Sequence, residues 1–280
     1  FESFIASVAG VISKVKIVHI HGGELTFGSR DDLYRHAITK MSDFHFVSSA
    51  LYKKRLIQIG ENEKNIFKVG ALCNDNINTL KTLNKKDLEK SLRTNFYDRN
   101  ILVSLHPNTQ SKKKNMIEIN EVFKSFYKFN DCKFFFSAPN SDENSEYIIE
   151  KIRNFCRIHK NAYYKASFGQ ELFLNLIKKC DLVIGNSSSG IIEAPLLGTP
   201  VINIGDRQKG RVKAQNTYDS NINYHKIISL INKILKEKKK KISFSKNPYY
   251  GKDVSGKIFK ILNQLSFDNY SHKYFRDIKF

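Results

Sequence analysis

The sequence predicts an α/β fold made of two doubly wound domains with parallel sheets. Short apolar segments of strand length alternate with amphipathic segments of helix length, which is the pattern that βαβ crossovers produce. The chain has 280 residues, 41% of them hydrophobic, so it is long enough for two cores. Residues 70–84 are polar and rich in turn-forming residues, and we interpret them as a linker between two series of elements.

The first series opens with a core helix, because aromatic and aliphatic residues recur at helical spacing over residues 1–12. Apolar runs then predict strands, and amphipathic runs between them predict helices. The expected strands are Lys16–His21, Phe44–Ser48 and Ile66–Val69, and the expected helices are Asp31–Ser42 and Ala50–Ile59.

The second series has a longer alternation. Residues 247–251 (Asn-Pro-Tyr-Tyr-Gly) predict a turn, and a last helix follows it. The expected strands are Ile101–Leu105, Lys133–Ser137, Ala162–Tyr164, Leu182–Gly185 and Val201–Ile204, and the expected helices are Asn115–Tyr127, Asn144–Cys156, Gln170–Cys180 and Val254–Leu265.

The chain begins at Phe1 rather than at methionine, and its first series has few strands for a doubly wound domain. We therefore expect an upstream segment to be missing and the first domain to be incomplete. An exposed sheet edge then makes the chain as given prone to aggregation, and we expect it to be inactive.

The net charge of +20 suggests a polyanionic partner. The lysines are scattered, however, and the dense runs Lys112–Lys114 and Lys236–Lys241 contain no aromatic residues for stacking on bases. No zinc-finger, helix-turn-helix or RNP pattern is present. We expect no nucleic-acid partner, and a basic nucleic-acid-binding module is the alternative outside the enzymes.

The four cysteines are far apart in the sequence and are typical of reduced thiols in a cytoplasmic protein. The apolar start lacks a basic leader and is too short to span a bilayer. His19 and His21 share a face of the expected strand, but no second set of metal ligands lies nearby in the sequence. We expect no membrane contact, no cofactor and no metal.

Residues 181–211 predict a strand, a small-residue turn, a short helix that Gly190 opens and that carries Glu193, and a second strand. Ser187, Ser188 and Ser189 place hydroxyl and N–H groups at the positive helix end, where phosphates bind. Basic residues that can neutralise the same anion follow on the next loop: Arg207, Lys209 and Arg211. We predict a diphosphate site; the alternative is an ordinary serine N-cap.

Acid–base candidates lie at the end of the first expected strand. Two glycines permit an unusual turn there, and Glu24 is a candidate acid or base with His21 beside it. Asp31 and Asp32 begin the next helix, four residues before Arg35 and His36. Capping and surface pairing explain this second pattern, unless one aspartate and the Arg–His pair turn onto the same site as Glu24.

Two further candidates lie in the second series. His106 ends a strand, and Pro107 stops the pairing, so the imidazole is a candidate proton donor or phosphate contact facing Glu24 across a cleft. Phe173 lies on the helix before the serine strand and can pack either against a nucleobase or within the core.

Together these motifs resemble the hydrolysing UDP-N-acetylglucosamine 2-epimerases of bacterial sialic and legionaminic acid synthesis. The motifs that carry the resemblance are His-Gly-Gly-Glu at 21–24, Asp-Asp-x-x-Arg-His-x-x-Thr-Lys at 31–40, Leu-His-Pro at 105–107, Gly-Asn-Ser-Ser-Ser-Gly-Ile-Ile-Glu-Ala-Pro at 185–195, Gly-Asp-Arg-Gln-x-Gly-Arg at 205–211 and Asn-Pro-Tyr at 247–249.

The resemblance implies a GT-B architecture, in which two Rossmann-like domains enclose a ligand cleft. The expected parts are the end of the first domain at 1–80, a nucleotide-binding domain at 81–250, a helix at 251–266 that crosses back, and a tail at 267–280. It also implies a reaction, in which UDP-N-acetylglucosamine and water give N-acetylmannosamine and UDP through a glycal. A homo-oligomer is expected for the full-length protein.

By the same resemblance, Ser187, Ser188 and Arg207 are expected to contact the nucleotide, Glu193 the ribose and Phe173 the uracil. His106, Asp31 and Asp32 match active-site positions, and the family's non-hydrolysing relatives carry a catalytic glutamate where this chain has His21. Whether His21 or Glu24 takes that role stays open. A GT-B glycosyltransferase, and the same chemistry on a GDP- or UDP-diacetamido-trideoxyhexose, are the alternative enzymes.

Overall fold

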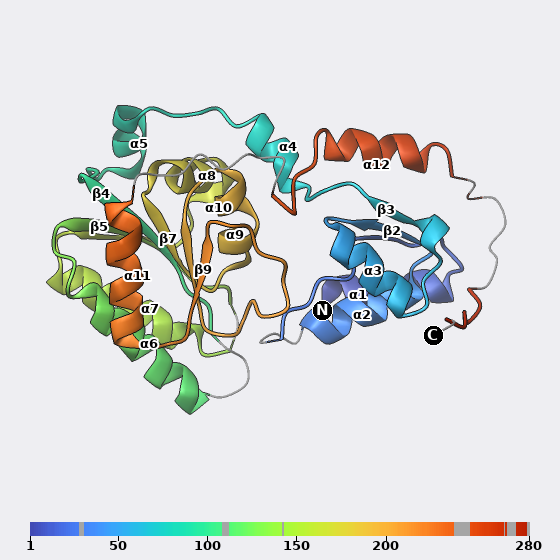
Figure 1. Ribbon diagram of the computed structural model, residues 1–280, viewed down its shortest axis with the longest axis horizontal. Helices are drawn as coiled ribbons and strands as arrows, with labels where there is room; N and C mark the ends of the chain where they lie inside the picture. The colour runs from blue at the N-terminus through green and yellow to red at the C-terminus, as the bar shows by residue number, and fades with distance from the viewer. Residues whose placement is uncertain are drawn as a thin grey trace. The chain divides into compact units, whose positions relative to one another are not determined.

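The computed structural model describes residues 1–27, 31–107, 112–141, 143–237, 247–265, 267 and 273–278, without the side chains of 112–115. The chain divides into two compact α/β units (Figure 1). The first comprises residues 1–78, 210–212 and 248–280, and the second comprises 79–209 and 213–247. Residues 210–212 therefore belong to the first unit, although the chain on both sides of them belongs to the second.

The first unit contains a parallel sheet in the order β1-β2-β3. Its strands are β1 (Val18–Ile20), β2 (Phe44–Val47) and β3 (Ile66–Lys68), and its helices are α1 (Glu2–Ile12), α2 (Asp31–Met41), α3 (Ala50–Gln58), α4 (Cys73–Asn78) and α12 (Val254–Leu262), with a 3-10 turn at Glu63–Asn65.

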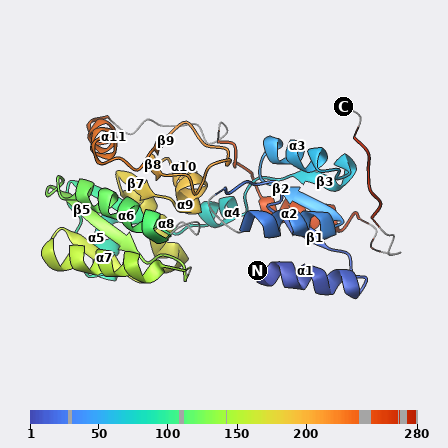
Figure 2. The ribbon, with the colours of Figure 1, turned by 90° about the horizontal axis from the view of Figure 1, so that it is seen from below.

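Alternate side chains of this sheet point to opposite layers. Phe46 of β2 packs with Val254 and Ile258 of α12 in one buried cluster. On the other face, His19 of β1 bonds to Thr39 of α2 at 3.1 Å. Figure 2 shows the sheet edge-on, with α2 between the sheet and α1. The period-2 pattern of each strand thus separates an apolar layer from a layer that buries polar groups.

Helix α1 differs from the expected core helix. The rings of Phe1 and Phe4 contact Tyr34 of α2, with centroids 5.9 and 5.5 Å apart. Ile5 and Ile12 are exposed, and Ser7 is the buried residue of the helix. The expectation of a buried core helix was wrong, because α1 packs on α2 through one face while Ile5 and Ile12 stay exposed.

The second unit contains a parallel sheet in the order β6-β5-β4-β7-β8-β9. Its strands are β4 (Arg99–Ser104), β5 (Cys132–Ser137), β6 (Ala162–Lys165), β7 (Leu182–Gly185), β8 (Val201–Ile204) and β9 (Thr217–Ser220), and its helices are α5 (Lys85–Leu92), α6 (Lys112–Phe126), α7 (Ser145–Ile158), α8 (Gly169–Lys179), α9 (Ser188–Ile191), α10 (Glu193–Leu196) and α11 (Tyr224–Lys236).

Helices cover both faces of this sheet, as Figure 1 shows. The larger core lies between the strands and α6, α7 and α11, and it includes the stacked rings of Phe123 and Phe136. Helix α8 packs on the other face, where Leu176 and Ile177 are fully buried. Burial on both faces explains why the central strands are almost continuously apolar.

Two elements of the second unit have no counterpart among the predictions, namely α5 and β9. Helix α5 has a strongly charged sequence that buries Leu88 and Leu92 alone, and β9 is a polar strand at the sheet edge. Part of the expected linker at 70–84 is also wrong, because α4 forms there and Asp75 accepts bonds from the first N–H groups of α12. Most of the lysine run at 236–241 lies outside the described residues.

Candidate functional site

The order of strands in the second unit changes direction at the centre of its sheet. The chain runs outward from β4 through β5 and β6, and then returns to form β7 on the other side of β4. In open α/β sheets, ligands bind at the carboxyl ends of two such strands, where the connections diverge. His106 lies just beyond the end of β4, and Ser187 lies just beyond the end of β7.

The two strand ends approach each other closely because residue 185 is glycine. Gly185 has φ +152°, and a Cβ atom there would overlap the carbonyl oxygen of Ser104. The next residue, Asn186, continues the pairing through its side chain. Its Oδ1 accepts from the His106 N–H at 2.7 Å, and its Nδ2 donates to the His106 carbonyl at 2.8 Å.

The buried ring of His106 is held in a neutral form. Its Nδ1 accepts a bond from the backbone N–H of Asn140 at 3.1 Å, which leaves the proton of the neutral ring on Nε2. Burial, together with the positive charge of Arg207, lowers the pKa of His106 to about 4. Near neutral pH this side chain can therefore donate a hydrogen bond to an anion, and it is a poor reservoir for an acidic proton.

The serine turn, which we predicted to bind a diphosphate, caps a very short helix. Ser187 caps α9, and its Oγ accepts from the Ser189 N–H at 3.4 Å. Ser188 and not Gly190 opens this helix, and Glu193 belongs to α10 rather than to the same helix. Because α9 has four residues, its dipole is small, and the polar groups that the turn offers are the half-buried hydroxyl and N–H groups of the serines.

The loop after β8 lies against this turn. Arg207 Nη1 and Gln208 Nε2 both donate to the carbonyl oxygen of Asn186, at 3.3 and 2.9 Å. The guanidinium is thus held next to the serine turn, as the diphosphate prediction requires. Phe173 is half-buried on α8, with its ring 6.5 Å from that of Phe168.

In the first unit, β1 ends in a turn with two left-handed residues. His21 has φ +67° and Gly23 has φ +78°, and a Cβ on Gly23 would lie 2.6 Å from the Tyr52 carbonyl oxygen. His21 therefore leaves the strand, and the expectation that it shares a strand face with His19 was wrong. A left-handed conformation at a residue other than glycine costs about 1–3 kcal/mol, and such strain is concentrated at functional sites.

Glu24 is buried at the centre of this turn, with 2% of its side chain exposed. Its Oε1 accepts from His21 Nδ1 at 2.9 Å and from Ser48 Oγ at 3.2 Å, and its Oε2 pairs with Arg211 Nη2 at 2.8 Å. Burial alone would raise the pKa of the Glu24 carboxyl, but the His21 hydrogen bond and the Arg211 charge bring it below its ordinary value. The carboxylate is ionised near neutral pH.

Helix α2 supports the same turn. Asp32 Oδ1 accepts from the Thr26 N–H at 2.7 Å, and Arg35 Nη1 lies 3.2 Å from both Asp32 Oδ1 and the Glu24 carbonyl oxygen. Arg35 thus pairs with Asp32 three residues earlier, and the expected proximity of Asp32 to His36 is present at 3.6 Å. Asp31 is exposed, and Asp32 acts in this structure as an anchor of the turn.

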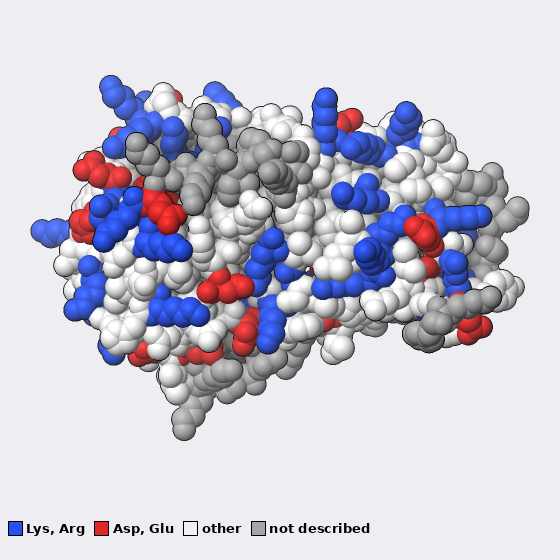
Figure 3. Space-filling model, viewed as in Figure 1, with Lys and Arg blue, Asp and Glu red and all other residues white. Residues whose placement is uncertain are grey.

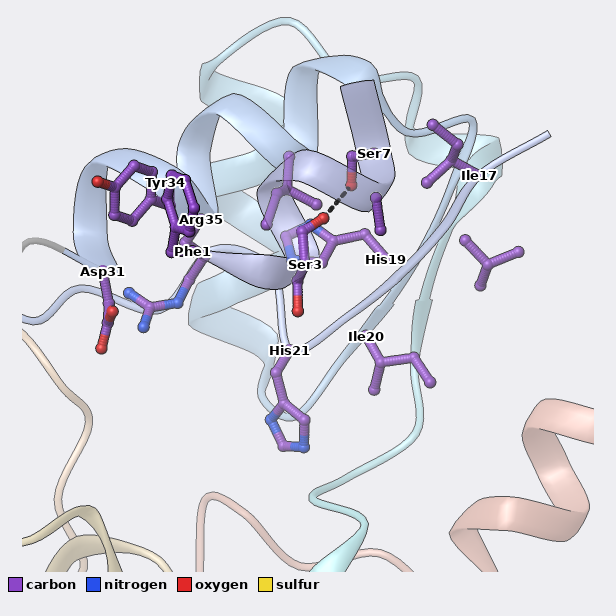
Figure 4. Close-up of a pocket in the computed structure, with 13 residues that line it drawn as sticks. Phe1, Ser3, Ser7, Ile17, His19, Ile20, His21, Asp31, Tyr34 and Arg35 are labelled. Carbon is purple, nitrogen blue, oxygen red and sulfur yellow. Dashed lines mark hydrogen bonds between the residues drawn. The ribbon is translucent and has the colours of Figure 1, made fainter. Parts of the chain in front are cut away.

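A cavity of about 590 Å³ lies beside these residues in the first unit. Figure 4 shows the ring of His21 extending from the end of β1, while Asp31 and Arg35 project from α2. His21 is 33% exposed, so it is far more accessible than Glu24. The structure thereby brings together His21, Glu24, Asp31, Asp32 and Arg35 in the first unit, and His106, Ser187, Ser188, Ser189 and Arg207 in the second.

Sequence reasoning missed two residues of this arrangement. Asn186 was part of the serine motif, but its bonds to His106 depend on the pairing of β4 with β7. Arg211 was expected beside the anion with Arg207, whereas it belongs to the first unit and pairs with Glu24. No spacing rule connects positions 24 and 211, so this partnership had no signal in the sequence.

Other features of the described residues concern the expectations on metal ions, membrane spans and surface charge. They contain no group of three or more histidine, cysteine or acidic side chains placed to hold a metal ion. None of their helices combines the length and apolar character needed to span a bilayer. On the face shown in Figure 3, Lys and Arg side chains are spread among uncharged residues and are interrupted by Asp and Glu.

Two parallel, helix-covered sheets define an α/β protein, and its structural neighbours have the GT-B architecture that the resemblance implies. Residues 1–263 match the family model described as UDP-N-acetylglucosamine 2-epimerase. The chain belongs to this family, and the resemblance based on its motifs is confirmed.

Among its relatives, the GDP/UDP-N,N'-diacetylbacillosamine 2-epimerase (hydrolyzing) of Campylobacter jejuni is 45% identical over 222 residues, which are 78% of this chain and 57% of that protein. The match thus spans little more than half of the relative's length. The polysialic acid biosynthesis protein P7 of Escherichia coli is 37% identical over 99% of this chain and 71% of its own.

Solved structures show the same fold. The UDP-GlcNAc 2-epimerase of Neisseria meningitidis, crystallised with UDP-GlcNAc, superposes with a TM-score of 0.77 at 20% identity, covering 94% of this chain and 73% of that one.

Proposed function

We propose that the whole protein to which this chain belongs is a hydrolysing nucleotide-sugar 2-epimerase that converts UDP-N-acetylglucosamine and water into N-acetylmannosamine and UDP. The observation that carries the proposal is the family match over residues 1–263, which includes both the His21–Glu24 pair and the serine turn. No cofactor or metal is required by this reaction.

The proposed reaction has two stages. A base removes the proton from C2, the electrons of that bond form the C1–C2 double bond, and UDP leaves with the electrons of the C1–O bond. Water then adds its oxygen to C1 of the glycal. C2 receives a proton on the face opposite to the one from which the first proton was removed, and this inverts C2. We assign the proton transfers to the group around His21 and Glu24, with Asp31, Asp32 and His106 as further active-site residues.

We assign UDP to the switch point of the second unit. The hydroxyl and N–H groups of residues 187–189 and the guanidinium of Arg207 suit a diphosphate, and neutral His106 can donate one more bond from Nε2. Glu193 is proposed for the ribose and Phe173 for the uracil.

A second substrate is favoured by the relatives. The Campylobacter protein described above and a Legionella pneumophila relative, 31% identical over 264 residues, are both named diacetylbacillosamine 2-epimerases (hydrolyzing). The same chemistry on a GDP- or UDP-linked diacetamido-trideoxyhexose is therefore the second candidate function.

Product analysis tests the proposal. Purified whole protein is incubated separately with UDP-N-acetylglucosamine and with UDP- and GDP-diacetylbacillosamine, and the products are resolved by chromatography and NMR. We expect free nucleoside diphosphate and a free epimerised sugar in equal amounts. Release of nucleotide that requires an added sugar acceptor would identify a glycosyltransferase, and an epimer still linked to nucleotide would exclude hydrolysis.

A further inference from the structure

Arg211 has an unusual environment for a buried arginine. Its side chain is 9% exposed, and Nη2 pairs with Glu24 Oε2 at 2.8 Å. Its Nε and Nη1 atoms have no hydrogen-bond partner among the described residues. Glu24 is thus the carboxylate that compensates this buried charge, and breaking such a pair is costly for either partner.

The other oxygen of Glu24 extends the interaction to His21. Because an ionised carboxylate can only accept, Oε1 of Glu24 accepts a hydrogen bond from the Nδ1–H of the ring, 2.9 Å away. In this tautomer the imidazole presents a lone pair on Nε2. The ring is partly exposed and lines the cavity of the first unit, as Figure 4 shows.

Glu24 itself is poorly placed to contact a substrate. Its side chain is almost fully buried, and Oε1 and Oε2 are both occupied by bonds from His21, Ser48 and Arg211. A carboxylate that orients a histidine while a second group holds the carboxylate is a known arrangement for fixing a tautomer.

We propose that Arg211 is a positioning residue of the proposed epimerase: acting through Glu24, it fixes the tautomer and orientation of His21, whose Nε2 accepts the C2 proton. In this step the electrons of the C2–H bond form the C1–C2 double bond, and UDP departs with the electrons of the C1–O bond. The inference rests on the proposed function, and it assigns the reacting base to His21 and the supporting role to Glu24.

Activity against pH tests the positioning role. Around the Glu24–His21 pair, the titratable and charged neighbours are Arg35 from α2, His19 from β1, Tyr52 from α3, Tyr249 and Arg211. Without the Arg211 charge, Glu24 should take up a proton at higher pH. In Arg211→Met we expect kcat/KM to fall about tenfold at pH 6 relative to wild type, with a smaller loss at pH 8 and unchanged UDP affinity.

Arg55→Met is the matched control. Arg55 donates to the Gly23 and Gly210 carbonyl oxygens, so it ties the same segments together without bonding Glu24. We expect its profile of kcat/KM against pH to match that of wild type. We expect Arg211→Lys, which keeps the charge, to recover most of the kcat/KM lost at pH 6. A profile of Arg211→Met that is not shifted on its acid side, or an equal shift in Arg55→Met, would overturn the proposal.

The ¹⁵N NMR shifts of the labelled His21 ring test the proposal without any turnover. We expect the Nδ1–H tautomer in wild type and Arg55→Met, and its loss in Arg211→Met and Glu24→Gln. If Arg211→Met does not fold, Glu24→Gln provides the comparison. An Nε2–H tautomer in wild type, or no change in Glu24→Gln, would contradict the positioning role even if the protein hydrolyses nucleotide sugars. A protein that hydrolyses none would contradict the proposed function instead.

Discussion

The side-chain amide of Asn186 forms two hydrogen bonds with the backbone of His106, at 2.7 and 2.8 Å. These bonds continue the pairing of β4 with β7 beyond the last residues of the strands. They also join the serine turn to the histidine, and the carbonyl of Asn186 accepts from Arg207 and Gln208. One side chain thus fixes the spacing of the elements that we assign to the diphosphate.

Replacing Asn186 by alanine should destabilise the protein by about 2–3 kcal/mol, because two buried backbone groups of His106 lose their partners. Urea denaturation gives this difference directly. Asn120→Ala is the control at an exposed position of α6, and we expect it to change the free energy of unfolding by less than about 0.5 kcal/mol. Equal effects of the two variants would mean that the Asn186 bonds contribute nothing specific.

Arg207→Ala should weaken UDP binding by about 1.5–3 kcal/mol, the usual effect of losing a hydrogen bond to a charged group. Isothermal titration calorimetry on the whole protein measures it. Arg99→Ala removes an exposed arginine that pairs with Asp131 on the same unit, and its UDP affinity should equal that of wild type. An Arg207→Ala protein that binds UDP as wild type does would remove the guanidinium from the proposed site.

Two buried histidines should make the fold sensitive to mild acid. Burial and then the charges of His45 and Arg35 lower the pKa of His19 to about 3, and burial and Arg207 lower that of His106 to about 4. Both rings take up protons near pH 6.5 after unfolding, so the unfolded state binds more protons below that pH. The free energy of unfolding should therefore fall with decreasing pH, by up to about 1.4 kcal/mol per pH unit for each histidine.

Denaturation curves at pH 7, 6 and 5 check this expectation. His19→Gln should remove its share of the slope, because glutamine does not titrate, and Gln offers a polar atom for Thr39. An identical slope in wild type and His19→Gln would show that His19 is not held neutral in the folded protein.

The C-terminal segment is held by a buried carboxylate. Lys273 pairs with Glu61 and donates to three carbonyl oxygens at the end of α2, those of Thr39, Lys40 and Ser42. Burial would raise the pKa of Glu61, but bonds from His45, Lys273 and Lys40 lower it to about 2. The stabilisation from Glu61 is present above pH 4.5 and is lost as the pH falls toward 2.

Lys273→Met should cost about 2 kcal/mol of folding free energy at pH 7, because buried Glu61 loses one of its charged partners and three carbonyl oxygens near the end of α2 lose their donor. Thermal unfolding monitored by circular dichroism measures it, and Lys260→Met, at an exposed lysine of α12, is the control. The difference in stability between the two variants should narrow as the pH falls toward 2, because Glu61 begins to be protonated there. Equal melting temperatures at pH 7 would show that the tail does not stabilise the first unit.

The hydrophobic pattern of the sequence predicted those elements whose burial is evident from their own residues. Leu182–Gly185 and Val201–Ile204 form strands with the predicted bounds, because buried parallel strands are apolar at every position. Helix α5 was not predicted, since its charged sequence becomes helical by packing Leu88 and Leu92 on the second unit.

The same distinction applies to the site. His21 and Glu24 are three residues apart, so their interaction was accessible to sequence reasoning, and the structure shows it at 2.9 Å. The pairing of Glu24 with Arg211 and of Asn186 with His106 depends on contacts between distant segments. The sequence therefore indicated that His21 and Glu24 lie beside each other, but it could not tell which carboxylate is buried or which histidine is exposed.

The fate of the C2 hydrogen tests the central claim most directly. Whole protein is incubated in D₂O with UDP-N-acetylglucosamine or the diacetylbacillosamine nucleotides, and the products are followed by proton NMR. Elimination to a glycal followed by hydration predicts a free epimerised sugar that carries deuterium at C2, together with released nucleoside diphosphate. A product that keeps its original C2 hydrogen, or an epimer that remains attached to the nucleotide, would contradict the account.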